Sequence, residues 1–132
     1  MTTLTYLDLA RRYLKAIEDG DATCVTNLFT PEAIIEQLPN RIYPKGLRAD
    51  VSRVAAAFEQ GRKLFSRQTY EITSHSATGD ILALEVLWTG TLSISFGTLT
   101  AGENMRCHSA MFLQFRDGKI AAQRNYDCFD PW

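Results

Sequence analysis

The first half of the chain carries its hydrophobic residues at helical spacing. Apolar side chains recur every three or four residues over positions 4–19 and predict a first helix there. Its inner face carries Leu7, Ala10, Leu14 and Ile17. Gly20 suits the end of this helix, because glycine tolerates the left-handed backbone found at helix ends. Asp21 can then cap a short second helix that runs to Leu28 or Phe29.

The segment that follows Pro31 changes character twice. Residues 33–38 predict a first strand, although a helix stays open for so short an apolar run. The prolines and the glycine of residues 39–46 predict a loop. A third helix is expected over residues 48–65. The apolar positions assigned to its inner face are Val51, Val54, Phe58 and Leu64.

The second half of the chain alternates between apolar and polar residues, as strands do. This alternation predicts long strands over residues 67–77, 81–94, 105–115 and 119–126. Asp117-Gly118 is a strong signal for a tight turn between the last two strands. Gly90 interrupts the second strand of this set and is interpreted as a bulge at which the sheet bends. Helices followed by long strands predict an α+β fold in which one curved sheet and three helices enclose a pocket.

Both faces of the late strands carry apolar residues. In residues 105–115, one face presents Met105, Cys107, Met111, Leu113 and Phe115, and the other presents His108, Ala110, Phe112 and Gln114. A sheet that is apolar on both faces has to be covered on both. The helices can cover only one face, so we expect a second copy of the chain on the other, in a homodimer.

The composition is that of an ordinary globular protein, and it argues against several function classes. The 132 residues suit a single domain over 1–132, and they are 45% hydrophobic and 22% charged. The formal net charge is -1, and there is no basic stripe of the kind that binds nucleic acid. No apolar run approaches the length of a membrane span, and the N-terminus lacks the pattern of a signal peptide.

Cysteine and histidine are too sparse for a metal site. The three cysteines have no spacing typical of zinc binding, and only two histidines, His75 and His108, are present. An odd number of cysteines favours reduced thiols in the cytoplasm over a disulfide framework. There is no phosphate-binding loop or dinucleotide fingerprint either, so we expect neither a metal nor a cofactor.

Four short segments, together with the order of the elements, link the chain to a known superfamily. They are Arg12–Ile17 with Gly20-Asp21, Leu28-Phe29 leading into Ala33–Glu36, Trp88–Thr91 and Phe115–Ile120. This pattern resembles the nuclear transport factor 2-like superfamily, and the last two segments are especially similar to its SnoaL-like polyketide cyclases. The resemblance implies a cone-shaped, cystatin-like sheet, mixed but mostly antiparallel, which encloses a pocket with three N-terminal helices.

Ketosteroid isomerase belongs to the same superfamily, and three of its functional positions carry over to this chain. Its oxyanion-binding tyrosine corresponds to Tyr13, and its protonated aspartic acid corresponds to His108. Its base corresponds to Gln37, whose amide has no useful basicity. The resemblance therefore implies an oxyanion-binding pair without the base, so steroid isomerisation by that mechanism is not expected.

Two carboxylates are candidates for moving a proton. Regular alternation sends Glu36 to the face opposite Gln37, so Glu36 becomes the base only if a bulge or a one-residue shift reverses them. Asp127 is the other candidate, because SnoaL-like cyclases have their acid–base aspartate late in the sequence. With a regular pleat, Asp127 points away from the face that Arg124 and Tyr126 share.

A further group of residues is expected to bind the ligand. In addition to Gln37, the candidates are Trp88, Phe112, Arg124 and Tyr126. For the aromatic side chains the alternative is packing in the core. For Arg124 the alternative is an ion pair with Asp127 or Asp130.

Three functions are compatible with these residues, and the sequence alone leaves them open. The first is an enzyme, an isomerase, cyclase or hydrolase, that moves a proton on an apolar substrate with a carbonyl group or a ring. The second is a protein that binds a small apolar ligand without converting it, which Gln37 in place of a base favours. The third is a dimeric interaction module that works through its sheet face.

Overall fold

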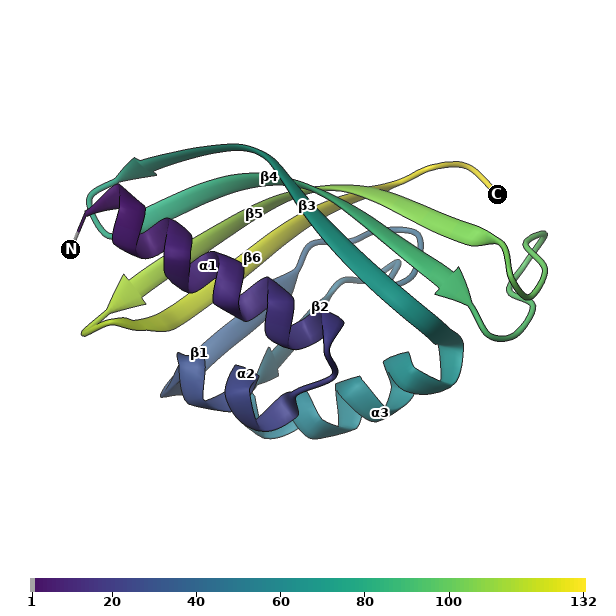
Figure 1. Cartoon of the computed structure of the whole chain (residues 1–132), viewed down its shortest axis with the longest axis horizontal. Helices are drawn as coiled ribbons and strands as arrows, with labels where there is room; N and C mark the ends of the chain where they lie inside the picture. Colours follow the sequence, from purple (N-terminus) through teal and green to yellow (C-terminus); the bar gives the residue numbers. More distant parts are fainter. Residues whose placement is uncertain (1) are drawn as a thin grey trace.

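The computed structural model describes residues 2–132, which form three α-helices, one short 3-10 helix and six strands (Figure 1). The helices are α1 (Thr3–Glu18), α2 (Ala22–Leu28), η1 (Val51–Arg53) and α3 (Val54–Leu64). The strands are β1 (Phe29–Gln37), β2 (Leu47–Asp50), β3 (Phe65–Thr78), β4 (Ile81–Leu92), β5 (Asn104–Arg116) and β6 (Lys119–Phe129). This arrangement confirms the α+β fold class that the sequence predicts.

The six strands form one mixed sheet in the order β2-β1-β6-β5-β4-β3. β1 and β6 are parallel, and every other neighbouring pair is antiparallel. Figure 1 shows the strands curling, with α1 lying across the sheet and with α2 and α3 beside β1 and β2. All three helices lie on one side of the sheet, which is its concave side.

The first helix packs against the sheet through the predicted apolar stripe. The side chain of Thr2 accepts a hydrogen bond from the Thr5 N–H and caps the helix. The buried residues of α1 are Tyr6, Leu7, Ala10, Tyr13, Leu14 and Ala16. The ring of Tyr6 stacks on Phe115 of β5, with 4.5 Å between the ring centroids. Burial of each large apolar side chain contributes about 1.5–3 kcal/mol, so α1 holds Tyr13 firmly against the sheet.

The largest difference from the predicted elements lies in residues 47–53. The sequence predicts the start of the third helix over residues 48–53, but residues 47–53 form β2 and η1, and α3 begins only at Val54. β2 pairs antiparallel with residues 34–37 of β1. Asp50 ends this strand, because its side chain accepts a hydrogen bond from the Ser52 N–H. β1 itself begins at Phe29, earlier than expected, and the helical alternative for residues 33–38 is excluded.

Two predictions that depend on glycine have different outcomes. Asp117 and Gly118 have φ of 51° and 77° and form the turn between β5 and β6, as predicted. Gly90 is not a bulge, because strand pairing continues through it on both sides. A Cβ at Gly90 would lie 2.6 Å from the ring of Trp88 and 2.8 Å from that of Phe65. Glycine is therefore needed to leave room for the Trp88 indole.

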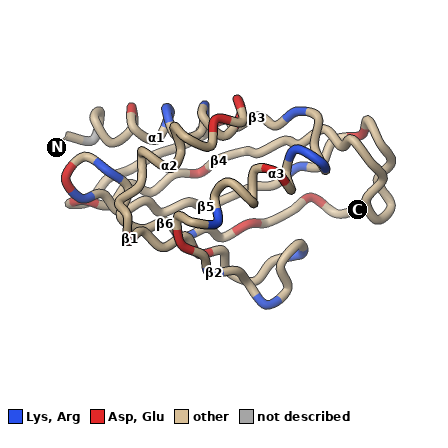
Figure 2. Tube along the Cα trace, turned by 90° about the horizontal axis from the view of Figure 1, so that it is seen from below, with Lys and Arg blue, Asp and Glu red and all other residues tan. Residues whose placement is uncertain are grey.

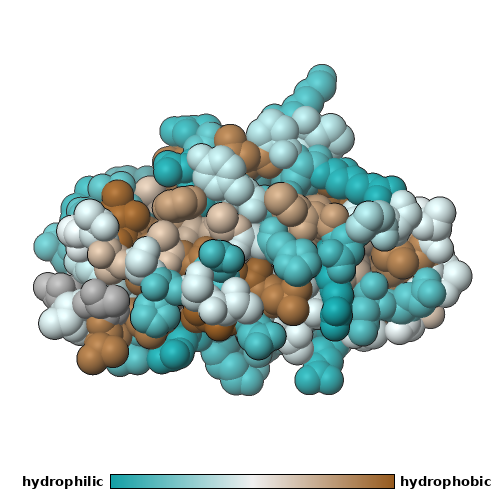
Figure 3. All heavy atoms as spheres, turned by 90° about the horizontal axis from the view of Figure 1, so that it is seen from above, coloured by the Kyte–Doolittle hydropathy of each residue, from teal (hydrophilic) through white to brown (hydrophobic). Residues whose placement is uncertain are grey.

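The hydrophobic core lies between α1 and the inner faces of β4, β5 and β6. Its strand residues include Leu82, Leu84, Val86, Leu113 and Phe115, each at most 2% exposed. Charged residues of both signs are spread along the trace (Figure 2), and apolar and polar surface alternate on the face shown in Figure 3. No helix in the part of the chain that the structure describes is long and apolar enough to cross a membrane.

Candidate functional site

Beyond the packed core, the helices and the sheet surround a cavity of about 1230 Å³. Its walls come from α1, α3, the first two strands and the inner faces of β3 to β6. The large apolar side chains that line it are Phe58, Phe65, Trp88, Met105, Met111 and Phe129. Ligand sites commonly measure roughly 300–1,000 Å³, so this cavity has room for a molecule with two or more fused rings.

The strand register decides which polar side chains reach this cavity. On β6 the alternate residues Gln123, Asn125 and Asp127 face it, and Ser109 faces it from β5. Ser109 is the cross-strand partner of Asp127. The sheet side of the cavity wall therefore carries a row of polar groups along β6 and β5.

These polar groups form a directed chain of hydrogen bonds that starts on α1. The Tyr13 hydroxyl donates to Oε1 of Gln123 at 2.5 Å, and Nε2 of Gln123 donates to Oδ1 of Asn125 at 3.0 Å. The side chain of Asn125 in turn bonds to Asp127. The Ser109 hydroxyl donates to Oδ1 of Asp127 at 2.6 Å. The chain thus ends on a carboxylate, which only accepts hydrogen bonds when it is ionised.

The electrostatics of this chain differ between its two ends. Burial raises the pKa of Asp127 above the ordinary 3.8, and the hydrogen bonds from Ser109 and Asn125 offset part of that effect. Burial also raises the pKa of Tyr13, so its hydroxyl keeps its proton at neutral pH. Asp127 is accordingly a better proton acceptor than an exposed aspartate, whereas Tyr13 serves as a neutral donor.

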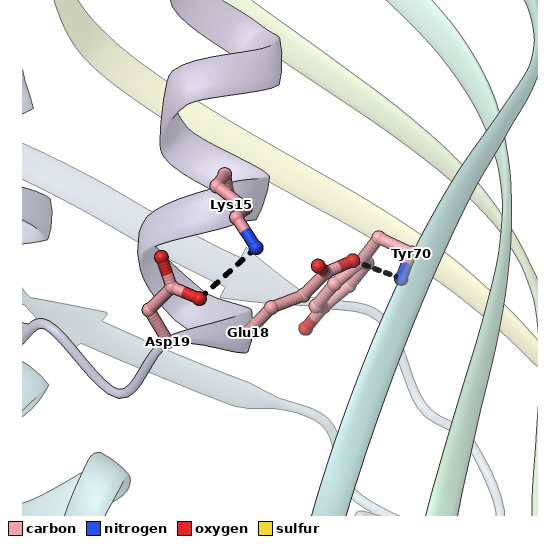
Figure 4. A network of polar contacts seen from close by, with 4 residues as sticks. All are labelled: Lys15, Glu18, Asp19 and Tyr70. Carbon is pink, nitrogen blue, oxygen red and sulfur yellow. Dashed lines mark hydrogen bonds and ion pairs between the residues drawn. The ribbon is translucent and has the colours of Figure 1, made fainter.

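A second polar group of the cavity lies where the end of α1 meets β3 (Figure 4). Oε2 of Glu18 accepts a hydrogen bond from the Tyr70 N–H at 2.7 Å. Lys15 pairs with Asp19 at 3.1 Å, and Glu18 points away from this pair towards β3. The side chain of Tyr70 lines the cavity. Burial raises the pKa of this phenol, and the nearby Tyr13, Asp127 and Glu18 add to the effect.

Four of the residues that sequence reasoning selected line the cavity, namely Tyr13, Gln37, Trp88 and Asp127. Oε1 of Gln37 accepts a hydrogen bond from Nδ2 of Asn40 at 3.5 Å, in the loop after β1. Nε1 of Trp88 donates to Oε1 of Gln68 on β3 at 3.0 Å. The structure therefore brings together the α1 tyrosine, the late aspartate, one amide and one indole.

The other five selected residues lie outside this cavity: Glu36, His108, Phe112, Arg124 and Tyr126. Glu36 is the neighbour of Arg124 in the parallel pair of β1 and β6. Neighbours in a sheet share a face, and Arg124 is exposed on the outer face. The alternation is regular from Ile34 onward, so Gln37 faces the cavity and Glu36 faces away.

The outer face also carries His108, so the structure does not bring it together with Tyr13. The inner face of β5 consists of the odd-numbered residues, such as Cys107 and Ser109, and His108 lies between them. Its side chain is 67% exposed, and its Nε2 lies 3.2 Å from Oδ1 of Asp130. The comparison with ketosteroid isomerase therefore placed His108 on the correct strand, but the side chain lies on the face opposite the cavity.

Phe112, Arg124 and Tyr126 gather in a cluster on the same outer face. The Arg124 guanidinium lies 5.3 Å from the centre of the Phe112 ring. Nε of Arg124 donates to the Tyr126 hydroxyl at 3.2 Å, instead of pairing with Asp127 or Asp130. These three residues contact one another, but they contact solvent rather than the cavity.

Sequence reasoning did not select several residues of the site. They are Glu18, Tyr70, Ser109, Gln123 and Asn125. One signal was available, because Gln123, Asn125 and Asp127 place polar side chains at every second position of a strand. Polar residues at that spacing, facing the same way as a core, point to a lined cavity. Within residues 2–132, no three His, Cys, Asp or Glu residues form a group that could hold a metal ion.

A curved mixed sheet with helices on its concave side is the fold of the nuclear transport factor 2-like superfamily. The chain belongs to the SnoaL-like domain family, whose model matches residues 10–123. This confirms the resemblance seen in the sequence. A search among curated proteins found no match.

Solved structures with the same fold include proteins with several different descriptions. IdmH of Streptomyces antibioticus, described as a "putative polyketide cyclase", is 23% identical with a TM-score of 0.74, over 93% of this chain and 90% of that one. An M. tuberculosis protein described as an "LEH-like epoxide hydrolase" is 16% identical with a TM-score of 0.74, over 97% of this chain and 84% of that one. A Catenulispora acidiphila protein with a ketosteroid isomerase-like fold, solved with trimethylamine, is 14% identical with a TM-score of 0.73, over 89% and 83%. At these identities the likeness shows the fold alone.

Proposed function

We propose that this SnoaL-like protein is an acid–base enzyme, an isomerase, cyclase or hydrolase, whose apolar substrate carries a carbonyl group or a ring. The observation that carries the proposal is Asp127, a half-buried carboxylate with a raised pKa on the wall of a large apolar cavity. Ser109 and Asn125 hold this carboxylate in place. Proton abstraction next to a carbonyl needs a positioned base of this kind in a site that excludes water.

In the proposed reaction, Asp127 takes a proton from the carbon next to the substrate carbonyl. The electron pair of the broken C–H bond forms a carbon–carbon double bond, and the carbonyl oxygen takes up the negative charge of an enolate. An isomerase then returns the proton from Asp127 to another carbon. In a cyclase the enolate carbon attacks a second carbonyl carbon of the same molecule, the π bond of that carbonyl breaks, and its oxygen takes the proton from Asp127 to become a hydroxyl. Neither of these two reactions requires a co-reactant.

Gln37 lies on the cavity wall and would orient a polar group of the substrate or a water molecule. Its amide does not accept a proton at neutral pH, so the base of ketosteroid isomerase has no counterpart at this position. The proposed base therefore lies on β6 instead of β1, so the proposed reaction differs in mechanism from that of ketosteroid isomerase. The cyclase and hydrolase descriptions of related structures support this choice of reaction classes.

The proposal can be tested with 2-tetralone, a bicyclic ketone with acidic protons beside its carbonyl. In heavy water, the wild-type protein is expected to accelerate the exchange of these protons for deuterium, followed by proton NMR. Asp127→Asn should reduce the catalysed rate by about 100-fold or more, the usual contribution of a positioned base. Glu36→Gln is the matched control, because it removes a carboxylate from the outer face, and it should leave the rate unchanged.

Two results would count against this function. Equal exchange rates for the wild type and Asp127→Asn would show that Asp127 is not the base. Binding of 2-tetralone without any acceleration of exchange by the wild type would favour the alternative of a non-catalytic ligand-binding protein, for which Gln37 in place of a base is the supporting observation.

The homodimer also stays a prediction. The surface available to a second copy is the outer face of the sheet, where Tyr126 is 44% exposed beside Phe112 and Arg124. The molecular mass in solution, measured by sedimentation, would decide between one copy and two.

A further inference from the structure

An enolate needs a hydrogen-bond donor at its oxygen as well as a base at its carbon. Tyr13 is the tyrosine that the family resemblance assigns to that oxygen. Its hydroxyl, however, donates to Oε1 of Gln123 at 2.5 Å, and both side chains are buried. A tyrosine hydroxyl has a single proton, so Tyr13 has none left for a ligand while this bond exists.

The orientation of the Gln123 amide holds the Tyr13 hydroxyl in this hydrogen bond. Its Nε2 donates to Asn125, which fixes the orientation of the amide and leaves Oε1 as the acceptor that faces Tyr13. If the Tyr13 hydroxyl donated its hydrogen bond to a ligand oxygen instead, Oε1 of Gln123 would be left buried without a donor. Loss of such a buried bond is costly, so Tyr13 positions the chain that leads to Asp127.

Tyr70 is in the opposite situation. Its hydroxyl forms no hydrogen bond with any residue in the described range 2–132, and its pKa is shifted by burial and nearby charges without a contribution from a hydrogen bond. Among the described side chains that are not exposed, the one fully enclosed polar atom without a partner is Oγ1 of Thr30. The Tyr70 oxygen is therefore not enclosed, and since its side chain lines the cavity, it is accessible from there.

The position of Tyr70 relative to Asp127 follows from the strand register. Tyr70 of β3 lies opposite Trp88, which lies opposite Cys107, which lies opposite Phe129 of β6. Phe129 is two residues beyond Asp127, so three strand spacings, about 14 Å, separate the backbones of Tyr70 and Asp127 along the sheet. Both side chains line the cavity on the concave side, and the Asp127 carboxylate is near enough to help raise the pKa of the Tyr70 phenol. The indole of Trp88 forms an apolar part of the cavity wall between Tyr70 and Asp127.

We propose that Tyr70 donates a hydrogen bond to the carbonyl oxygen of the ligand and that Asp127 faces the acidic carbon of the same molecule. This inference rests on the proposed function and specifies its substrate class as ketones with two or more fused rings, which the cavity has room for, with their rings against Trp88. The Tyr70 hydroxyl stabilises the enolate oxygen as charge develops there. Glu18 holds the Tyr70 backbone N–H and so fixes the position of this donor on β3.

The test compares two ligands that differ in one oxygen atom, 2-tetralone and tetralin. Their dissociation constants are measured by calorimetry for the wild type, Tyr70→Phe and Tyr13→Phe. Tyr70→Phe should weaken the binding of 2-tetralone by about three- to tenfold, the usual effect of one neutral hydrogen bond, and leave that of tetralin unchanged. Tyr13→Phe is the matched control, and it should leave the affinity ratio of the two ligands within about twofold of the wild type.

The infrared carbonyl stretch of bound 2-tetralone gives a second readout, which a loss of stability would not imitate. It should lie at a lower wavenumber in the wild type and in Tyr13→Phe than in Tyr70→Phe. The inference is overturned if 2-tetralone does not bind, if Tyr70→Phe retains the wild-type affinity and stretch, or if Tyr13→Phe is the variant that loses them. Asp127→Asn should keep the low-wavenumber stretch, so failure of proton transfer and failure of this hydrogen bond are observed separately.

Discussion

Both faces of β6 carry polar side chains, but in very different environments. The inner face has Gln123, Asn125 and Asp127, of which the two amide residues are 6% and 8% exposed. The outer face has Arg124 and Tyr126, both exposed. Each face forms a hydrogen bond between side chains two residues apart, from Gln123 to Asn125 on the inside and from Arg124 to Tyr126 on the outside.

The difference teaches that burial, more than residue type, decides what such a cluster can do. On the inner face of β6 each of the three polar side chains has a hydrogen-bond partner, and the chain of bonds ends on a carboxylate whose pKa burial raises. On the outside, water competes for each hydrogen bond and screens the charge of Arg124. A sequence pattern shows both clusters equally well, whereas only the cluster on the side that the helices cover lines the cavity.

Truncation of neighbouring apolar residues on the two faces should have the largest effect on stability. Leu113→Ala removes an inner side chain that is 0% exposed, and it is expected to lower the free energy of unfolding by about 2–5 kcal/mol. Phe112→Ala removes a half-buried outer ring, and its loss should be about 1 kcal/mol. Urea unfolding of the three proteins measures both values. A loss for Phe112→Ala as large as that for Leu113→Ala would mean that a second copy covers the outer face.

Replacement of adjacent polar residues by leucine should separate the faces by a smaller amount. Gln123→Leu leaves the Tyr13 hydroxyl buried without its acceptor and removes the donor to Asn125, which should cost about 1–3 kcal/mol. Arg124→Leu breaks an exposed bond to Tyr126 and should change stability by about 0.5 kcal/mol or less. Urea unfolding of the two variants at neutral pH is the measurement. Equal losses would contradict the view that the inner chain depends on burial.

Most of the fold could be predicted from the sequence because its signals are local. The apolar stripe of α1, the Gly20-Asp21 boundary and the Asp117-Gly118 turn each depend on residues close together in the chain. β2 could not be predicted in this way. Leu47–Asp50 has no marked strand pattern, and it is a strand because β1 offers it a free edge for pairing. Gly90 shows the same limit, since its close neighbours Trp88 and Phe65 meet only in the folded sheet.

The site was predictable only where alternation along one strand was enough. Alternation correctly put Glu36 on the face opposite Gln37 and Arg124 on the face opposite Asp127, whereas Gln37 and Asp127 themselves were candidates because of the family resemblance, and both line the cavity. His108 could not, because both faces of β5 carry apolar residues and the sequence does not say which one the helices cover. The role proposed for Tyr70 depends on the hydrogen bond that Tyr13 donates to Gln123. These two residues are 110 positions apart, so the sequence gives no local sign of it.

The smallest effect concerns pH, where Asp127 in the cavity and Asp50 on the surface should behave in opposite ways. Burial raises the pKa of Asp127 in the folded protein. Its favourable contribution to the free energy of unfolding is therefore present below pH 3.8 and is lost as the pH rises through the folded-state pKa. Hydrogen bonds from Ser52 lower the pKa of Asp50, so its contribution is present above 3.8 and is lost as the pH falls through its folded value. The wild type should therefore lose stability relative to Asp127→Asn as the pH rises from 3.8 towards neutrality, and relative to Asp50→Asn as the pH falls below 3.8. Urea unfolding in a pH series measures both differences, and a wild type that instead gained stability over Asp127→Asn with rising pH would show that the hydrogen bonds from Ser109 and Asn125 outweigh the effect of burial on the Asp127 pKa.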